Sequence, residues 1–239
     1  AMTTLSTDPF KYLIAPREFA DRIPEGFKGA IFRDGSDPPG TIPCELAEVA
    51  PDDVAMLLHT SATTGKSKGV MLTAANLAAN YDRTPGWLGL SSEDTILCAL
   101  PPYNTFGLNQ CINAMALTGL TLVLHARFEA GSCIADIVRH RCTYLPAVPT
   151  MLQKLVDHPG LKPGDLASLR RIMTGGAPVP AALLAKVLQA TGGQTQVLTG
   201  YGLTEASALV TLAHVELGVD GEVLRGRTIG RVLDGMELG

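Results

Sequence analysis

Short apolar runs alternate with amphipathic segments along most of this chain, and the alternation predicts its secondary structure. Strands are expected at 54–58, 69–72, 95–100, 121–124, 142–148, 169–174 and 195–199. Helices are expected at 74–81, where Thr73 is a suitable cap, and at 107–117, 132–140, 150–156 and 180–191. This order predicts an α/β fold, a mainly parallel sheet flanked by helices.

The first fifty residues differ from the rest, because they are rich in proline and in turn residues. They are expected to form a lead-in and linker over 1–50, with a short helix near 16–20 and a strand at 30–33. The α/β subdomain is expected over 51–239. After Thr211 the chain becomes glycine-rich and polar without a closing element, so the subdomain looks truncated at its C-terminal end.

Composition excludes some classes of function. A net charge of −4 and a pI near 5.7 argue against a nucleic-acid partner. No signal peptide is legible, and the longest apolar stretch, 111–126, is too short to span a membrane. The histidines are scattered, so no metal cluster is legible. The cysteines lack Cys-x-x-Cys spacing, which indicates reduced thiols and a cytoplasmic location: Cys44, Cys98, Cys111, Cys133 and Cys142.

The stretch 59–70 has the highest concentration of candidate ligand-binding residues in the chain. Its hydroxyl side chains, lysines and glycines follow the apolar run 54–58. The run 54–58 is expected to be a buried strand, and a buried strand that opens into such a loop is suited to holding phosphate oxygens. A solvent-exposed Ser/Thr-rich turn is the alternative. A Walker A loop is disfavoured, since Thr60 stands where that motif needs glycine and 69–72 is expected to be extended.

Two further predicted strands are also followed by loops that contain glycines and hydroxyl-bearing side chains. The first loop is Thr174-Gly175-Gly176-Ala177-Pro178, and the second is Thr199-Gly200-Tyr201-Gly202-Leu203-Thr204-Glu205. Ligands of open α/β sheets collect beyond the carboxyl ends of strands. Tyr201 offers a stacking face, and Glu205 facing a polyphosphate would need a hard cation such as Mg²⁺ between them. Ordinary packing of Tyr201, a solvated Glu205 and a simple Gly-Gly-Ala-Pro turn are the alternatives.

Taken in order, these three motifs resemble those of the acyl-adenylate-forming superfamily, which includes acyl-CoA synthetases, peptide-synthetase adenylation domains and luciferases. The loop at 60–70 is similar to the family pattern Thr-Ser-Gly-Thr-Thr-Gly-x-Pro-Lys-Gly-Val, from which Ala62 and Ser67 depart. The string 200–205 matches the family's Gly-Tyr-Gly-x-Thr-Glu at every position. The resemblance implies the large N-terminal domain of an adenylate-forming enzyme.

The resemblance also implies roles for individual residues. ATP would be held by the phosphate loop (Thr60, Ser61, Thr63, Thr64, Gly65 and Lys68) and by the two later loops (Gly175, Gly176, Ala177, Pro178, Gly200, Tyr201, Gly202 and Thr204). Within this set Thr204 would contact the α-phosphate, and Glu205 would hold Mg²⁺. Lys68, Thr204 and Glu205 are the expected catalytic residues.

The expected acid-binding residues are Tyr103, Asn104, Gly107, Thr174 and Thr199. The segment 100–108 resembles the acyl-CoA synthetase pattern Leu-Pro-x-Phe-His-x-x-Gly. Amino-acid-activating relatives place an aspartate after the aromatic residue, and here that position is the neutral Asn104. The substrate is therefore expected to be an acid without an amino group.

The function that the resemblance implies is ATP-dependent formation of an acyl-adenylate, followed by acyl transfer to a thiol, coenzyme A being favoured. The matched part is less than half of the family's usual chain and lacks the C-terminal domain with its catalytic lysine, so the fragment alone is expected to be inactive. An adenylation domain that loads a carrier protein is one alternative. A non-catalytic nucleotide-binding module is another, motivated by Ala62, Ala74 and Asn104. The oligomeric state is not indicated.

Overall fold

A computed structural model describes residues 12–15, 30–33, 48–60, 68–217, 223–225 and 228–237. The chain forms two compact units, 1–48 and 49–239. In the first, β1 (Tyr12–Ala15) pairs in parallel with β2 (Ala30–Arg33), which confirms the predicted strand at 30–33. The helix expected near 16–20 lies outside the described residues.

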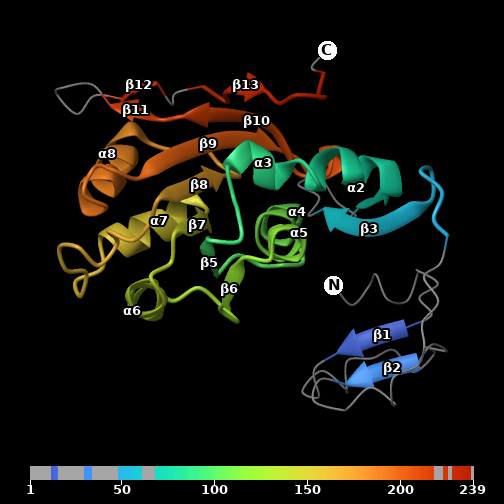
Figure 1. Ribbon diagram of the computed structural model, residues 1–239, viewed down its shortest axis with the longest axis horizontal. Coiled ribbons are helices and arrows are strands. Elements are labelled where there is room, and N and C mark those ends of the chain that lie inside the picture. Colours follow the sequence, from blue (N-terminus) through green and yellow to red (C-terminus); the bar gives the residue numbers. More distant parts are fainter. Residues whose placement is uncertain are drawn as a thin grey trace. The chain divides into compact units, whose positions relative to one another are not determined.

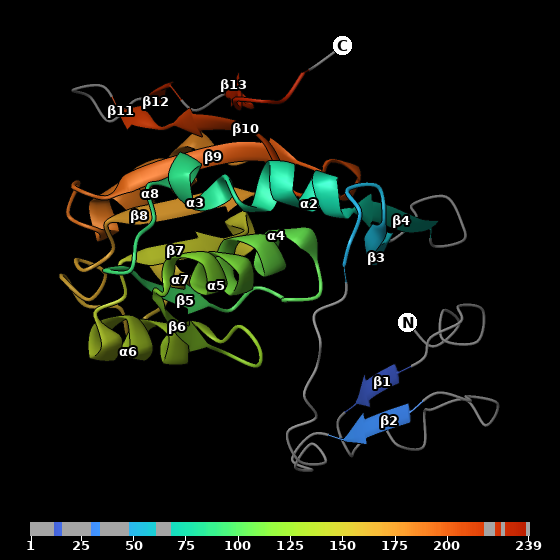
Figure 2. The same cartoon turned by 45° about the vertical axis from the view of Figure 1, so that its right-hand side comes forward.

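The second unit is built on a seven-stranded sheet, which Figures 1 and 2 show in two views. Its strand order is β13-β10-β9-β8-β7-β5-β6. The strands from β9 to β6 are parallel, while β10 and β13 are antiparallel to their neighbours. This confirms the predicted, mainly parallel sheet. Its strands are β5 (Thr95–Cys98), β6 (Thr121–Leu124), β7 (Tyr144–Ala147), β8 (Arg171–Gly175), β9 (Gln196–Gly202), β10 (Leu209–His214) and β13 (Arg231–Val232).

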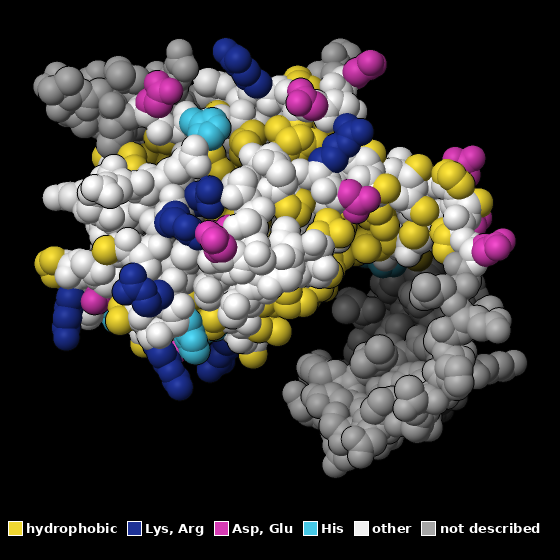
Figure 3. Space-filling model, viewed as in Figure 1, with side chains coloured by type: hydrophobic (Ala, Val, Ile, Leu, Met, Phe, Trp, Pro, Cys, Tyr) yellow, Lys and Arg dark blue, Asp and Glu magenta, His cyan; other side chains and the backbone are white. Residues whose placement is uncertain are grey.

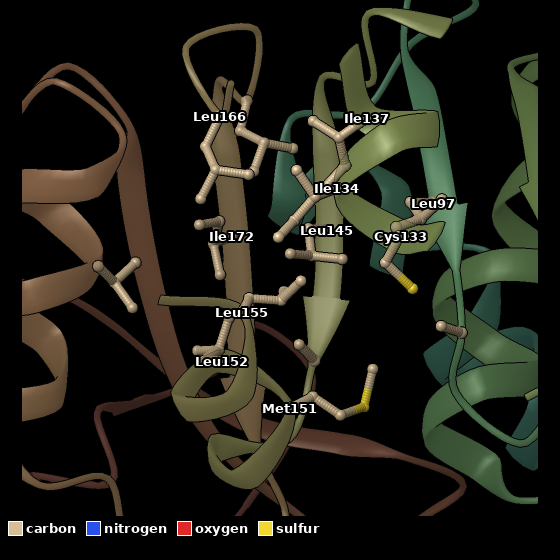
Figure 4. Close-up of a cluster of buried hydrophobic side chains, with 14 of the residues drawn as sticks. Leu97, Cys133, Ile134, Ile137, Leu145, Met151, Leu152, Leu155, Leu166 and Ile172 are labelled. Atoms are coloured by element: carbon tan, nitrogen blue, oxygen red, sulfur yellow. The ribbon is translucent and has the colours of Figure 1, made fainter. Parts of the chain in front are cut away.

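Helices cover both faces of this sheet. One face packs against α6 (Ala130–His140), α7 (Pro149–Val156) and α8 (Ala181–Ala190), as the buried side chains of Figure 4 illustrate. The other face packs against α3 (Thr84–Leu88), η2 (Leu108–Asn113) and α5 (Ala114–Thr118). Successive strand residues alternate between the two cores, because side chains of a strand point to opposite faces. Leu145, for example, enters the first core and Tyr144 the second.

A separate antiparallel hairpin precedes the sheet and consists of β3 (Val54–Thr60) and β4 (Lys68–Thr73). Its first strand was expected to be buried, and that is wrong: Val54 is 55% exposed and Leu57 39%. The reason is that β3 pairs only with β4 and does not enter the main sheet. Figure 3 shows apolar side chains gathered on this part of the surface.

The hairpin leads directly into α2 (Ala74–Tyr81), which begins where the sequence predicts. The Thr73 hydroxyl accepts from the Asn76 N–H, and the Asn76 side chain accepts from the Thr73 N–H, so the two form a reciprocal cap. The buried Asn80 then donates to the carbonyl oxygens of Ala206 and Leu209, which ties this helix to the segment after β9.

Other elements differ from the prediction in their limits. The helix expected at 107–117 is a composite of α4 (Thr105–Gly107), the π-helical η2 and α5. The strand expected at 95–100 ends at Cys98, and the strand expected at 195–199 continues to Gly202 because β10 pairs with its extension. A further hairpin joins β11 (Glu216–Leu217) and β12 (Val223–Arg225).

Four of the five cysteines are described, and all four are free and buried. Cys133 and Cys142 belong to the core on the α6–α8 face, while Cys98 and Cys111 belong to the opposite core. No helix in the described part of the chain combines the length and apolar character needed to cross a bilayer.

Candidate active site

The two glycine-rich loops predicted to bind nucleotide are neighbours in the structure. Strands β8 and β9 run side by side in parallel, with Gly175 opposite Gly200. Beyond their carboxyl ends lies a cleft of about 580 Å³. It is lined by Thr174, Gly176, Ala177, Pro178, Val179, Thr199, Gly200, Tyr201, Gly202, Thr228 and Ile229. The structure thus brings together most of the residues that the two later loops are expected to contribute to ATP binding.

Two hydroxyl groups in this cleft have no internal hydrogen-bond partner. Thr174 and Thr199 face each other in the β8–β9 register, and their side chains are 0% and 5% exposed. Neither Oγ1 atom has a partner among the described residues. A buried hydroxyl without a partner is unfavourable, so this pair is suited to a ligand that supplies the missing hydrogen bonds.

Two glycines of these loops have a role in strand packing. A Cβ atom at Gly200 would lie 2.6 Å from the Thr211 carbonyl oxygen, and one at Gly202 would overlap the Ala208 carbonyl. The close pairing of β9 with β10 therefore requires these two glycines, in addition to the ATP contact that the family resemblance implies for them. Gly176 differs, since its φ of +80° favours glycine while the space around it stays open to the cleft.

The motif after β9 ends in a 3₁₀ turn, η3 (Thr204–Ala206). Tyr201 lines the cleft with 44% of its surface exposed, so a face of its ring is accessible for stacking. Glu205 lies in the first turn of η3 and is exposed, whereas Thr204 is half-buried. Within the described residues no three metal-ligating side chains cluster. A Mg²⁺ ion held mainly by substrate phosphates needs only one or two protein carboxylates, and Glu205 fits that requirement.

Lys68 begins β4 and lies opposite Thr60 in the hairpin, so the two residues flank the predicted phosphate loop. The loop itself, with Ser61, Thr63, Thr64 and Gly65, falls outside the described residues. Strand β4 contacts η3, the turn that carries Glu205. In Figures 1 and 2 the hairpin lies beyond the end of the sheet toward which β8 and β9 point. The sequence placed the phosphate loop after a strand of the main sheet; the structure instead brings it there on a separate hairpin.

Three of the expected acid-binding residues line neither this cleft nor the cavity beside it. Tyr103 is 79% exposed. The Oδ1 atom of Asn104 accepts from the Gly107 N–H at 2.8 Å and so caps α4. Gly107 packs directly under the Pro101 carbonyl, which leaves no room for a side chain. Their contact with substrate stays a prediction.

A smaller cavity of about 70 Å³ adjoins the cleft and shares Gly176, Gly200 and Gly202 with it. Its remaining lining residues are Thr105, Phe106, Gln110, Met173, Gly175, Ala208 and Leu209. None of Thr105, Phe106 and Gln110 was predicted as a site residue, although the first two lie within the motif at 100–108 and Gln110 lies two positions beyond it. The available signal was their nearness to that motif.

Comparison with known proteins identifies this arrangement. The family model described as AMP-binding enzyme matches residues 15–238. The chain belongs to the AMP-binding enzyme family. Its relatives include a 3-[(3aS,4S,7aS)-7a-methyl-1,5-dioxo-octahydro-1H-inden-4-yl]propanoyl:CoA ligase from Mycobacterium tuberculosis, 39% identical over 82% of this chain and 38% of that protein. A feruloyl-CoA synthase from Amycolatopsis is 36% identical over 81% of this chain and 38% of its own.

Solved structures of AMP-binding enzymes share the fold. MatB from Rhodopseudomonas palustris superimposes with a TM-score of 0.80 at 24% identity, covering 98% of this chain and 47% of that one. An o-succinylbenzoate coenzyme A synthetase from Bacillus subtilis, in complex with ATP and magnesium, gives 0.72 at 25% identity over 94% of this chain and 50% of its own. The chain therefore spans about half the length of these structures and less of the curated relatives.

Proposed function

We propose that the protein containing these residues is an acid–thiol ligase of the acyl-CoA synthetase type. In the first step, a substrate carboxylate oxygen attacks the α-phosphorus of ATP, and the bond to pyrophosphate breaks. In the second, the thiol of coenzyme A attacks the acyl carbon, and AMP leaves as the new thioester forms. The relatives that support this are CoA ligases at 36–39% identity.

The observation that carries the proposal is the cleft at the ends of β8 and β9. It combines an accessible aromatic ring, Tyr201, with the unpartnered hydroxyls of Thr174 and Thr199. A purine base presents a flat face that can stack on the Tyr201 ring, and the substrate acid, for which Thr174 and Thr199 are the expected contacts, carries oxygen atoms that can accept from the two hydroxyls. The neighbouring main-chain segment 176–178 would form the opposite wall around adenine.

The charged residues would act on the phosphates. Lys68 and the loop hydroxyls would neutralise the charge that develops on the departing pyrophosphate, and Thr204 would donate to the α-phosphate. Glu205 would hold Mg²⁺, which when bound screens the phosphate charges. None of these residues must act as a nucleophile, because the reaction is promoted by positioning and charge neutralisation.

The proposed acid carries no amino group, and coenzyme A is the proposed acceptor. Asn104 is neutral, and its side-chain oxygen is occupied by the α4 cap. An amide carries no negative charge, so Asn104 cannot form an ion pair with a substrate ammonium group as an aspartate would.

The chain itself is proposed to be a piece of the catalytic machinery. Residues 1–50 would be the lead-in, and 51–239 the nucleotide-binding subdomain of a larger N-terminal domain. A separate C-terminal domain of the same protein would supply the catalytic lysine. The 239-residue piece is accordingly expected to bind ATP weakly and to turn over little.

The test is ATP–pyrophosphate exchange by the full-length protein with a panel of carboxylic acids. Exchange with at least one acid, followed by thioester formation with coenzyme A, supports the proposal. Acyl transfer to a phosphopantetheinyl carrier protein in place of coenzyme A would indicate a carrier-loading enzyme. Absence of exchange with every acid, in a protein that still binds ATP, would indicate a non-catalytic nucleotide-binding module.

A further inference from the structure

The small cavity beside the cleft is lined by one buried amide side chain, that of Gln110. This residue lies in the π-helical turn η2, is 1% exposed and lines the cavity. Insertions of this kind in a helix often occur at functional sites, because they redirect individual side chains. Here Gln110 lines a space whose other walls are mainly apolar side chains and glycine.

A buried tyrosine fixes which end of that amide faces the cavity. The hydroxyl of Tyr144, on β7, donates to Oε1 of Gln110 at 2.5 Å. Tyr144 is 0% exposed, and burial raises the pKa of its hydroxyl well above the usual value, so the group stays protonated and remains a donor. With Oε1 engaged, the donors that remain to Gln110 are the two N–H groups of Nε2, since the bond from Tyr144 is its one side-chain hydrogen bond in the described part of the chain.

The rest of the lining restricts what can accept from those donors. No lysine, arginine or acidic side chain lines the cavity, and Thr105 is the one other polar side chain there. An ionised group would therefore lose its hydration without gaining a partner of opposite charge. A neutral carbonyl oxygen needs only donors, and Gln110 supplies them.

Size gives a second restriction. The cavity volume of about 70 Å³ is roughly half of the ~150 Å³ cavity that accommodates benzene in another protein. A long alkyl tail or a bulky ring system does not fit inside it as it stands. A branched end of a few heavy atoms, such as a methyl ketone or one edge of an oxo-substituted ring, is compatible with the space.

We infer that Gln110, held by Tyr144, is a specificity-determining residue that selects acids with a neutral carbonyl oxygen at the end remote from the carboxylate. The inference rests on the proposed function for the direction of the substrate, because the cavity adjoins the cleft assigned to the adenylate. The substrate class is thus an oxo-carboxylic acid, with the ketone in the small cavity and the carboxylate toward the cleft.

The experiment compares matched acids that differ only at the remote position. The oxo acids 4-oxopentanoate, 5-oxohexanoate and 6-oxoheptanoate are each paired with the acid in which a methyl group replaces the ketone oxygen. Binding to the full-length protein is measured by saturation-transfer NMR without ATP, and pyrophosphate exchange is measured separately. The wild-type protein is expected to bind at least one oxo acid about tenfold more tightly than its partner, since one hydrogen bond distinguishes them.

Three variants assign that preference to a residue. Gln110→Leu is expected to abolish the tenfold preference by weakening the oxo acid alone. Gln153→Leu, the same change outside both cavities, is expected to keep it. The double variant Gln110→Leu with Tyr144→Phe removes both hydrogen-bonding partners, which avoids a stranded tyrosine hydroxyl if the single variant folds poorly.

The outcomes separate this inference from the proposed function. Equal binding of both acids by the wild-type protein, no binding of either, or a preference that survives Gln110→Leu, overturns the role of Gln110. Loss of the preference in Thr105→Val, with Gln110→Leu unaffected, also overturns it and transfers the role to Thr105. A preference seen in binding without any pyrophosphate exchange leaves the inference standing and refutes the ligase proposal instead.

Discussion

Thr174 and Thr199 lie opposite each other on adjacent parallel strands, and both hydroxyls are buried without a partner in the described structure. Such a pair destabilises the protein unless a ligand satisfies it. Because both residues line the cleft, we expect the pair to be kept for ligand binding at the expense of stability.

The first prediction follows from this pair. Thr174→Val and Thr199→Val should each leave the free energy of unfolding unchanged or raise it by about 1 kcal/mol, because an unsatisfied hydroxyl is replaced by a methyl group. Pyrophosphate exchange should fall about tenfold in the same variants. Urea denaturation and exchange kinetics measure the two effects.

The matched control is Thr195→Val. The Thr195 hydroxyl is equally buried but donates to the Leu169 carbonyl oxygen at 2.6 Å. Its removal should lower the free energy of unfolding by about 1–2 kcal/mol, since the carbonyl loses its partner. A similar loss of stability in Thr174→Val would show that the cleft hydroxyls are bonded after all.

The second prediction concerns Lys68, which is exposed at the start of β4. Lys68→Ala should slow adenylation about a hundredfold through lost charge stabilisation, with little change in the melting temperature. Lys154→Ala, an exposed lysine on α7, should change neither quantity. An adenylation rate equal to the wild-type rate would remove Lys68 from the mechanism.

The third prediction contrasts a glycine of the cleft, Gly202, with a glycine of α3, Gly86. Gly202→Ala should lower the free energy of unfolding by at least about 2 kcal/mol, because the new methyl group would overlap the Ala208 carbonyl. Gly86→Ala should raise it by about 0.5–1 kcal/mol, since Gly86 lies within α3 with open space around it. Thermal denaturation of both variants checks the contrast, and equal effects would contradict the packing role given to Gly202.

The fourth prediction is an acid sensitivity that depends on Asp94, at the amino end of the sheet. Burial raises the pKa of this carboxyl group, but hydrogen bonds from the Thr143 hydroxyl, the Ser91 N–H and the Arg170 guanidinium outweigh burial and leave the pKa below its usual value. The depressed pKa in the folded state stabilises the protein above the unfolded value of about 3.9.

That contribution should disappear as pH falls through the folded-state pKa. The free energy of unfolding is therefore expected to decline below about pH 4, and the decline should be shallower in Asp94→Asn. At neutral pH the variant should also be less stable, since Arg170 loses a charged partner 2.9 Å away. Identical acid profiles for the two proteins would rule out Asp94 as the source.

The sequence predicted the α/β architecture well, because its strands and helices have distinct periodicities and carry clear end signals. Thr73 at the start of α2 and Gly119 after α5 are examples of such signals. The placement of β3 could not be inferred in the same way. An apolar run has the same pattern in a central strand and in an exposed hairpin, so pairing decides between them.

The candidate site was predictable where a motif lies on adjacent strand ends, as for Gly176 and Tyr201. It was not predictable around Gln110, since its orientation depends on a π-helical turn and on Tyr144, 34 positions further along the chain. Asn104 stays a predicted substrate contact, and the structure adds that its side chain caps α4, a local role that residue type alone does not reveal.

Each face of the sheet carries two buried cysteines, whose rate of alkylation depends on how often the layer around them opens. Cys133 and Cys142 are sealed in one core, and Cys98 and Cys111 in the other. A maleimide reagent can react with a thiol only during a fluctuation that opens the layer around it. Alkylation rates measured for each cysteine-containing peptide would therefore report the opening of the two layers separately. A comparison of these rates with and without nucleotide would show which layer the nucleotide stabilises.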